Sequence, residues 1–528
     1  MQSPRKLLLA LLFLAVLAPS AWLAWHWRAM PQLGYYHDDS IYWVTAKSIA
    51  DGDGYKIASL PQQPFQTKYP PLYPAFLSLV WRINPHFPDN LSLATLFAWL
   101  LFPPFIWLVW RFLNEQHFAR WECILLTTVA ALNPVAVLLS VSLMSELLFT
   151  SLFVAALLLA ERASKENAPV WLAAAAGGLG GLAYLTRSAA VSLLIAVPLV
   201  FLFQRRFRQA LVFAGCMLPP ALAWQAWTAA HLSPARDLVT LYYTNYLGFQ
   251  LYFLPLSDLP LVVWQNIESA LAGITKLLIF DVDFEIVHVQ RLVAVIALAG
   301  VVRLARQSRR FLFPVTAGVY LAMLLVWHYP PDQRFVFPLY PLLLAGLWTE
   351  LKNVVLVLKQ AWQKHQVADR GVAVLTGAVL AAFALFVCFT NVRGDFIVLP
   401  ELLADFRTDL QKRQPAYAWL AEHTSPDANV FAYDDPVLFL YARRKSCNFP
   451  VPPPLIYHRD DAQTSSLLHT LPEFAHRQQL NYVLVTSADF HRDLHDTGVK
   501  SIGDALRRTA AFEQVVRSPA WAIYRVLP

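Results

Sequence analysis

Long apolar runs recur along almost the whole chain and restrict its fold more than any other feature. A helix needs about 20 apolar residues to cross the hydrocarbon layer of a bilayer. Runs of about this length fall at roughly 7–27, 91–113, 121–140, 143–160, 170–186, 188–204, 209–230, 288–304, 310–328, 335–358 and 371–391. The sequence therefore predicts a mainly α, polytopic membrane protein with about eleven transmembrane helices.

The composition agrees with a membrane protein. Of the 528 residues, 57% are hydrophobic and 15% are charged, whereas soluble chains carry about 25% charged residues. The mean hydropathy is +0.44. The four cysteines show no CxxC spacing, so the sequence indicates neither a disulfide framework nor a cysteine metal site.

The distribution of Lys and Arg predicts the orientation. With a cytoplasmic N-terminus, the inner loops hold basic clusters such as 205–208 and 303–310, whereas the short outer turns hold little beyond Arg187 and Arg334. The net charge of +7 then belongs to the cytoplasmic face and does not indicate nucleic-acid binding. The first apolar run lacks a small-x-small cleavage site, and we interpret it as a retained helix. An odd number of helices places the C-terminal region outside the cytoplasm.

Three sizeable pieces are predicted on the outer face. They are a first loop at 28–90 and a second at 231–287, both within a transmembrane module of residues 1–393, and an extracytoplasmic α/β domain at 394–528. In the domain, the residue pattern predicts a helix at 415–422 and strands at 429–433, 482–486 and 520–526. In the first loop it predicts one helix that begins at the acids and ends at Asp51-Gly52-Asp53-Gly54, and a second, which the Lys68–Pro74 run opens and which extends through Trp81.

Two adjacent acids, Asp38 and Asp39, lie in the first outer loop beside His37. A carboxylate near hydrocarbon is costly unless it meets water, a cation or a proton-bearing partner. Either acid alone has an ordinary explanation as a helix N-cap, but two acids beside a histidine favour a site. A carboxylate there could take a proton from an acceptor group. The acids and His37 could also hold a divalent metal ion, so metal dependence stays open.

Glu146 is an acid near the outer start of a hydrophobic helix, on the predicted membrane face of Asp38. An ionisable residue in such a place is a functional candidate. The alternative is a capping role together with Ser142.

Arg187 and Arg334 are the cations of the same face. Arginine suits bidentate phosphate binding. The alternatives are snorkelling to the surface for Arg187 and an ion pair with Asp332 for Arg334. Lys68 is a third candidate partner for phosphate.

Short motifs follow one another in a fixed order along the membrane part of the chain. They are Asp38-Asp39-Ser40-Ile41-Tyr42, Ala46, Ile49, Gly52, the Lys68–Pro74 run, Ser145-Glu146, Thr186-Arg187 and Arg334 through Pro341. The order of these motifs resembles the GT-C superfamily of integral membrane glycosyltransferases. The closest groups are the protein mannosyltransferase-like (family 39) and aminoarabinose-transferase-like enzymes, over about residues 1–390.

The resemblance implies a polyprenyl-phosphate sugar donor and Asp38 as the base. The other candidate catalytic residues are Asp39, which stands where the family commonly has Glu, and Glu146, which matches the acid near the start of the fourth helix. Arg187 and Arg334, and after them Lys68, are implied to hold the donor phosphate. Accessory candidates within the same stretches are His37, Tyr42, Tyr69 and His328.

The function predicted in this way is that of a hexosyl- or pentosyltransferase in the plasma (inner) membrane. It would move a sugar to an extracytoplasmic acceptor with inversion at the sugar carbon. The alternatives are a transporter or flippase of lipid-linked sugars and a non-catalytic membrane scaffold. Transporters often carry paired repeats, and no internal repeat is evident in the sequence. The sugar, the acceptor, the oligomeric state and the role of the C-terminal domain stay open.

Overall fold

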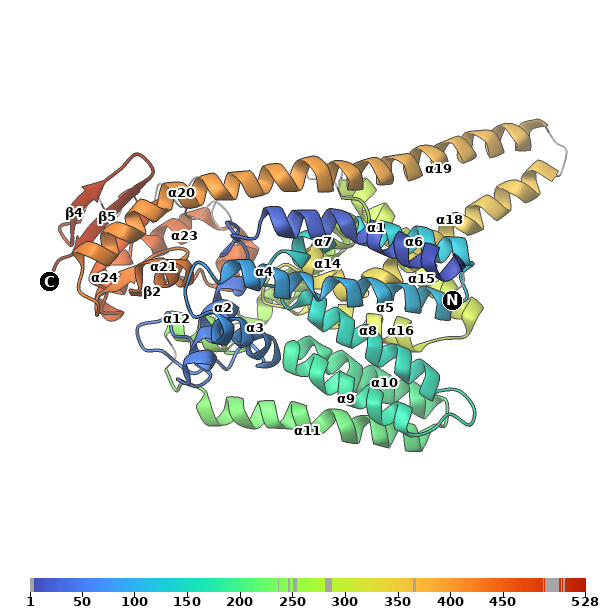
Figure 1. Cartoon of the computed structure of the whole chain (residues 1–528), viewed down its shortest axis with the longest axis horizontal. Helices are drawn as coiled ribbons and strands as arrows, with labels where there is room; N and C mark the ends of the chain where they lie inside the picture. Colours follow the sequence, from blue (N-terminus) through green and yellow to red (C-terminus); the bar gives the residue numbers. More distant parts are fainter. Residues whose placement is uncertain are drawn as a thin grey trace.

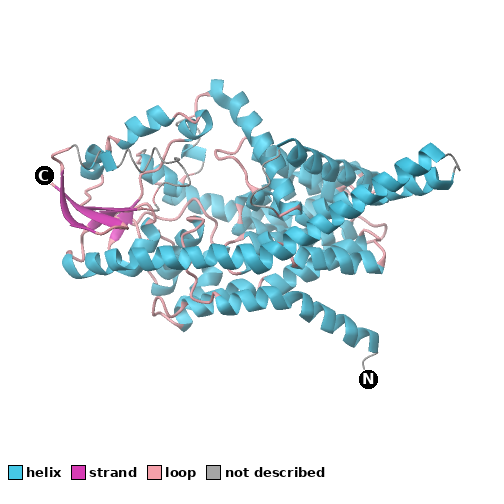
Figure 2. Ribbon diagram, turned by 90° about the horizontal axis from the view of Figure 1, so that it is seen from above, coloured by secondary structure: helices cyan, strands magenta, loops and turns pink. Residues whose placement is uncertain are grey.

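The computed structural model describes residues 4–235, 237–245, 247–249, 254–280, 287–363, 367–487, 489, 503–504, 506 and 509–528. The molecule is elongated, with most helices along its long axis and a small sheet at one end (Figure 1). The view from above shows the same sheet beside the helices (Figure 2). The predicted class is confirmed at this level: the chain is mainly helical and carries a small C-terminal sheet.

The first outer loop carries two helices that follow α1 (Pro4–His26). They are α2 (Asp38–Asp51) and α3 (Leu72–Ile83), and they lie where the sequence pattern predicts them. The helix α2 ends at Gly52, whose φ of 85° lies in the left-handed region that favours glycine. The two helices pack against each other through buried aromatic side chains, among them Trp43 and Trp81, whose ring centroids are 4.7 Å apart.

The helices that follow form the main bundle. They are α4 (Leu91–Trp99), α5 (Phe102–Glu115), α6 (Arg120–Ala131), α7 (Pro134–Ser140), α8 (Glu146–Ala163), α9 (Trp171–Thr186), η1 (Ser188–Ala190), α10 (Val191–Phe203), α11 (Phe207–His231), α15 (Val287–Ser308), α16 (Leu312–Leu325), α17 (Gln333–Val336), η3 (Phe337–Leu339), α18 (Tyr340–Gln363) and α19 (Val367–Arg393). Small residues allow close packing in this bundle. A Cβ on Gly177 of α9 would lie 2.3 Å from the carbonyl oxygen of Phe213 on α11.

The number of membrane spans differs from the prediction. Among the described residues, four helices are long and apolar enough to cross a membrane, namely Leu91–Glu115, Phe207–His231, Gln333–Gln360 and Gly371–His423. The bent pair α6 and α7 would make a fifth. The predicted count of about eleven is not confirmed, because predicted spans such as 170–186 and 310–328 form helices of only 16 and 14 residues.

The second outer loop is more helical than its composition suggests. It contains α12 (Leu238–Thr244), η2 (Leu256–Asp258) and a 20-residue helix, α14 (Leu259–Leu278). Asn266 fixes α14 to the bundle, because its side-chain amide donates to the carbonyl oxygens of Leu324 and Trp327 at 3.2 and 2.8 Å.

One long helical segment joins the bundle to the C-terminal domain (Figure 1). It runs from α19 through a π-helical turn, η4 (Gly394–Val398), into α20 (Leu399–His423). The boundary predicted at 393/394 thus falls inside a continuous helical segment, and the division into two domains stays a prediction.

The C-terminal domain is a mixed five-stranded sheet with short helices. The strands are β1 (Asn429–Phe431), β2 (Lys445–Cys447), β3 (Tyr482–Thr486), β4 (Phe512–Arg517) and β5 (Trp521–Val526), in the order β2-β1-β3-β5-β4. The helices are α21 (Asp435–Ala442), α22 (Pro453–His458), α23 (Asp461–Leu468) and α24 (Leu471–Arg477). Pairing is parallel at β2-β1-β3 and antiparallel at β3-β5-β4. The predicted helix lies in α20 and the three predicted strands match β1, β3 and β5.

A shared core fixes this domain against the first outer loop. One cluster of buried side chains includes Trp43 and Tyr73 from the loop helices together with Phe431 and Phe449 from the domain. The contact is close at Gly34, where an added Cβ would lie 2.6 Å from a methyl group of Val437. The first outer loop and the C-terminal domain therefore form one packed unit toward one end of the bundle (Figure 1).

Candidate active site

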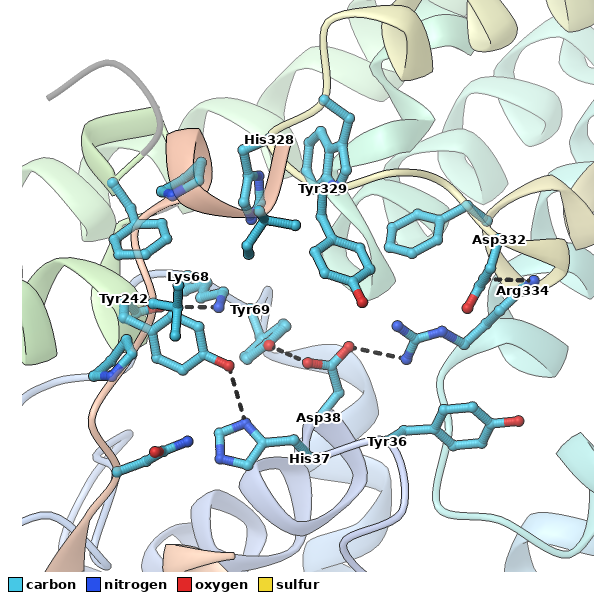
Figure 3. A pocket seen from close by; sticks show the side chains of 18 of the residues that line it. Tyr36, His37, Asp38, Lys68, Tyr69, Tyr242, His328, Tyr329, Asp332 and Arg334 are labelled. Carbon is cyan, nitrogen blue, oxygen red and sulfur yellow. Dashed lines mark hydrogen bonds and ion pairs between the residues drawn. The ribbon is translucent and has the colours of Figure 1, made fainter. Parts of the chain in front are cut away.

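A cavity of ≈ 350 Å³ lies where the first outer loop, the bundle and the C-terminal domain meet. This volume lies within the usual range for sites that bind small molecules. The first outer loop contributes His37, Asp38, Lys68 and Tyr69 to its lining (Figure 3). Ten of the lining residues are Tyr, Phe or Trp.

Asp38 is the first residue of α2 and projects into the cavity (Figure 3). Its Oδ1 accepts a hydrogen bond from the Tyr69 hydroxyl at 2.5 Å, and its Oδ2 lies 3.1 Å from Nη1 of Arg334. Burial alone would raise the pKa of Asp38, but the charges of Arg334 and Lys68 and the Tyr69 hydrogen bond lower it below its usual value. Asp38 is therefore a carboxylate at neutral pH.

Asp39 does not line the cavity. Successive helical residues point about 100° apart, and the carboxylate of Asp39 accepts from the backbone N–H groups of Gly34 at 3.0 Å and Ser40 at 2.9 Å. It is 1% exposed. The two acids thus diverge, and His37 contacts other partners. In the described part of the chain, no three His, Cys, Asp or Glu side chains form a group that could hold a metal ion.

Glu146 joins the two arginines of the predicted site. It is the first residue of α8 and is 1% exposed. Its Oε1 lies 2.7 Å from Nη1 of Arg187 and 3.6 Å from Nε of Arg334. Because Arg334 also pairs with Asp38, a chain of alternating charges runs from Asp38 through Arg334 and Glu146 to Arg187. The structure brings together all four residues that the motifs predict to converge.

The alternative explanations for these residues do not describe their contacts. The Ser142 hydroxyl donates to the carbonyl oxygen of Leu138, so it does not cap α8 with Glu146. Arg187 pairs with Glu146 and is not a snorkelling side chain. Asp332 accepts from the backbone N–H of Arg334 at 2.9 Å as the N-cap of α17, which leaves the guanidinium to Asp38 and Glu146.

Lys68 lies across Asp38 from Arg334 (Figure 3). Its ammonium donates to the carbonyl oxygen of Tyr242 at 2.9 Å and lies 4.5 Å from the centre of the Tyr242 ring. Burial lowers its pKa to about 8, against the opposing charge of Asp38. The structure therefore places Lys68 on the wall opposite Arg334, where it adds positive charge to the cavity.

His37 connects the cavity to the C-terminal domain. Its Nε2 lies 3.1 Å from Oδ1 of Asp435, and its Nδ1 lies 3.3 Å from the Tyr242 hydroxyl. The Tyr243 hydroxyl donates to the same oxygen of Asp435 at 2.5 Å. Burial alone would lower the pKa of His37, but the hydrogen bond and charge of Asp435 raise it above its usual value.

The other accessory candidates also lie at the site. Tyr69 holds Asp38, His328 lines the cavity, and the Tyr42 hydroxyl lies 3.3 Å from the hydroxyl of Ser145, next to Glu146. Sequence reasoning missed Tyr242 and Asp435. The Asp434-Asp435 pair before an apolar helix was the one available signal, and it also fits the turn that the structure has there.

A second, apolar cavity of ≈ 40 Å³ adjoins the first. The two share Tyr69, Arg187, Trp327 and Phe335, and α16 lines the second with Tyr320, Met323 and Leu324. Arg187 therefore lies between a polar space and an apolar one.

Comparisons with known proteins give only distant matches. No family model and no curated protein sequence matches the chain. Among solved structures, ArnT from Cupriavidus metallidurans bound to undecaprenyl phosphate is 14% identical over 98% of this chain and 97% of that one, with a TM-score of 0.48. The oligosaccharyltransferase of Archaeoglobus fulgidus is 14% identical over 90% and 69%, with a TM-score of 0.49.

A third match is the arabinofuranosyltransferase AftD from Mycobacteria, which is 16% identical over 97% of this chain and 40% of that one, with a TM-score of 0.43. All three are GT-C glycosyltransferases. They are proteins of the kind that the order of the motifs resembles. At TM-scores below 0.5, these matches assign neither chemistry nor substrate to this chain.

Proposed function

We propose that this protein is a membrane glycosyltransferase that moves a sugar from a polyprenyl-phosphate donor to an extracytoplasmic acceptor. The observation that carries the proposal is the cavity in which Asp38 faces Arg334, with Arg187 beside it. A base and two phosphate-binding cations around one space are the groups that such a transfer needs. We place the site at the outer leaflet of the plasma membrane, with the N-terminus in the cytoplasm.

Asp38 would act as the base. A hydroxyl or amine is a weak nucleophile, and a positioned carboxylate can accept its proton while it attacks the sugar carbon. The contacts of Asp38 with Tyr69 and Arg334 fix the direction of its oxygens. Direct displacement inverts the configuration at that carbon. Asp39 would not take part in the chemistry; its hydrogen bonds to the backbone hold the loop that presents Asp38.

Arg187 and Arg334 would stabilise the leaving phosphate. The oxygen of the lipid phosphate gains negative charge as its bond to the sugar breaks, and cations placed there lower the barrier. Guanidinium groups keep donors available after they pair with carboxylates, since each carries five N–H groups. The apolar cavity beside Arg187 would receive the first part of the lipid chain.

The test uses membranes that contain the protein, a radiolabelled undecaprenyl-phosphate sugar and a cell-envelope extract as acceptor. We expect label to move to the extract with inversion. A transporter or flippase would move the intact donor across the bilayer without breaking the sugar–phosphate bond. A scaffold would give neither result. Movement of the intact donor in the absence of transfer would disprove the proposal.

The pH dependence of donor binding follows from Lys68. Its pKa is about 8, so above this pH the cavity loses one positive charge and should bind an anionic donor more weakly. Measured by the half-saturating donor concentration, affinity should fall a few-fold between about pH 7 and pH 9.5. At the acid end, Asp38 should stay deprotonated below the pH at which an ordinary aspartate gains its proton, because its pKa is lowered.

The control for this prediction is Lys68→Arg, since a guanidinium keeps its charge throughout this range. The fall in affinity at high pH should disappear in this variant. An unchanged fall would assign the titration to a different group.

A further inference from the structure

The C-terminal domain supplies one wall of the cavity. Residues 433–434 and 448–451, together with Pro453 and Ile456, line it. The shared core and the close contact at Gly34 fix this wall relative to the loop that carries Asp38. The space beside the base is therefore closed only when the C-terminal domain is in place.

Asn448 is a buried polar side chain on this wall. It is 8% exposed and it lines the cavity. Its side-chain oxygen Oδ1 has no hydrogen-bond partner among the described residues. Buried polar groups in native proteins are nearly always hydrogen-bonded. A carboxamide oxygen that is left without a partner beside a cavity is suited to accept a hydrogen bond from a bound molecule.

The geometry of the transfer indicates which side of the cavity binds the donor phosphate and which side binds the acceptor. In a direct displacement, the attacking oxygen or nitrogen and the leaving oxygen lie on opposite sides of the sugar carbon. Figure 3 shows Arg334 on one side of Asp38, and His37, Lys68 and Tyr242 on the other. If the phosphate lies at the arginines, the acceptor approaches from the side of Tyr242, which adjoins the wall of the C-terminal domain.

Resting on the proposed function, we propose that the C-terminal domain forms the acceptor subsite and that Asn448 binds a hydroxyl- or amine-bearing acceptor. The Asn448 oxygen accepts a hydrogen bond from an O–H or N–H of the acceptor that does not react. The reacting O–H or N–H gives its proton to Asp38 as the new bond to the sugar carbon forms. The bond from that carbon to the phosphate oxygen breaks, and its electron pair stays on the phosphate.

Asp435 is a positioning residue for this subsite. It is 0% exposed, and its Oδ1 contacts both Tyr243 and His37. His37 in turn contacts the Tyr242 hydroxyl. The carboxylate of Asp435, on helix α21 of the C-terminal domain, thus fixes side chains that lie opposite Arg334 in the cavity.

The experiment separates donor from acceptor affinity. Membranes with the full-length protein receive a radiolabelled undecaprenyl-phosphate sugar and an envelope extract, and each is varied in turn. For Asn448→Ala, we expect the half-saturating amount of extract to rise about three- to tenfold, the range for one lost hydrogen bond. The half-saturating donor concentration should not change. The control is Gln463→Ala, an exposed side chain outside this cavity, which should alter neither value.

Asp435→Asn tests the positioning role, because it keeps the shape and removes the charge. It should also raise the half-saturating amount of extract and leave the donor value unchanged, whereas a general loss of folding would change both. Thermal melting of the purified protein shows whether each variant is folded, and Asn448→Ser replaces Asn448→Ala if the latter is not.

The possible outcomes distinguish the two proposals. No transfer by the wild-type protein would overturn the proposed function and, with it, the subsite. Normal transfer by the wild type, with acceptor values unchanged in folded Asn448 variants, would overturn the subsite alone. Equal changes in donor and acceptor values would also count against a subsite for the acceptor.

Discussion

Replacing Asp38 by Asn is expected to lower kcat for sugar transfer by about 10²- to 10⁴-fold, the usual contribution of a positioned general base. Asparagine has almost the same shape but cannot accept the proton of the acceptor. Affinity for undecaprenyl phosphate should change little, since Arg187 and Arg334 stay in place. Transfer is measured with a radiolabelled undecaprenyl-phosphate sugar, and lipid affinity with undecaprenyl phosphate alone.

The matched control is Asp53→Asn, an exposed carboxylate in the same outer loop. It should keep wild-type transfer, which would show that a lost negative charge in this loop is not enough to stop the reaction. Asp38→Glu should retain part of the activity, because it keeps a base and changes its reach. Transfer by Asp38→Asn at the wild-type rate would remove Asp38 from the mechanism.

The second large effect is expected at the pair of Arg187 and Glu146. Glu146 is 1% exposed and its Oε1 lies 2.7 Å from Arg187. Removing one partner of a buried ion pair usually costs about 3–5 kcal/mol, because the other charge is left buried. Arg187→Gln should therefore lower the thermal stability strongly, although Arg334 at 3.6 Å from Glu146 retains part of the compensation.

A double variant separates stability from binding. In Arg187→Gln with Glu146→Gln, no uncompensated charge remains, so much of the lost stability should return. Affinity for undecaprenyl phosphate should stay low, because the cation that we propose to contact the phosphate is still absent. Recovery of both properties in the double variant would mean that Arg187 serves only to neutralise Glu146.

The elements of this fold differ in how far the sequence predicts them. The loop helices α2 and α3 could be predicted because apolar spacing and terminating residues act locally, as at Gly52. The helix α14 was not predicted, because its residues lie in a Tyr- and Pro-rich segment between two predicted membrane-spanning runs. Strands β2 and β4 were missed, since both lie at edges of the sheet: β2 has the sequence Lys-Ser-Cys, without a β-branched or aromatic residue, and β4 carries charged residues.

The meeting of four charged residues at the site could be predicted, because the predicted membrane orientation placed them on one face. Placing Asp38, Glu146, Arg187 and Arg334 on one face left a small area in which they could meet. The contact of His37 with Asp435 could not be predicted in this way, because the two residues are 398 positions apart and their domains dock through side-chain packing. Nor does the adjacency of Asp38 and Asp39 show which of them faces the cavity.

The helical segment from Gly371 to His423 has a mechanical consequence. At about 1.5 Å and 100° for each residue, its 53 residues form a rod roughly 80 Å long, far longer than the hydrocarbon layer of about 30 Å. The number of residues in the rod thus sets both the distance of the sheet from the start of the rod and the rotation of the sheet about the rod axis. One inserted residue would rotate the sheet by more than a quarter turn, so this connector should tolerate length changes far less well than a flexible tether.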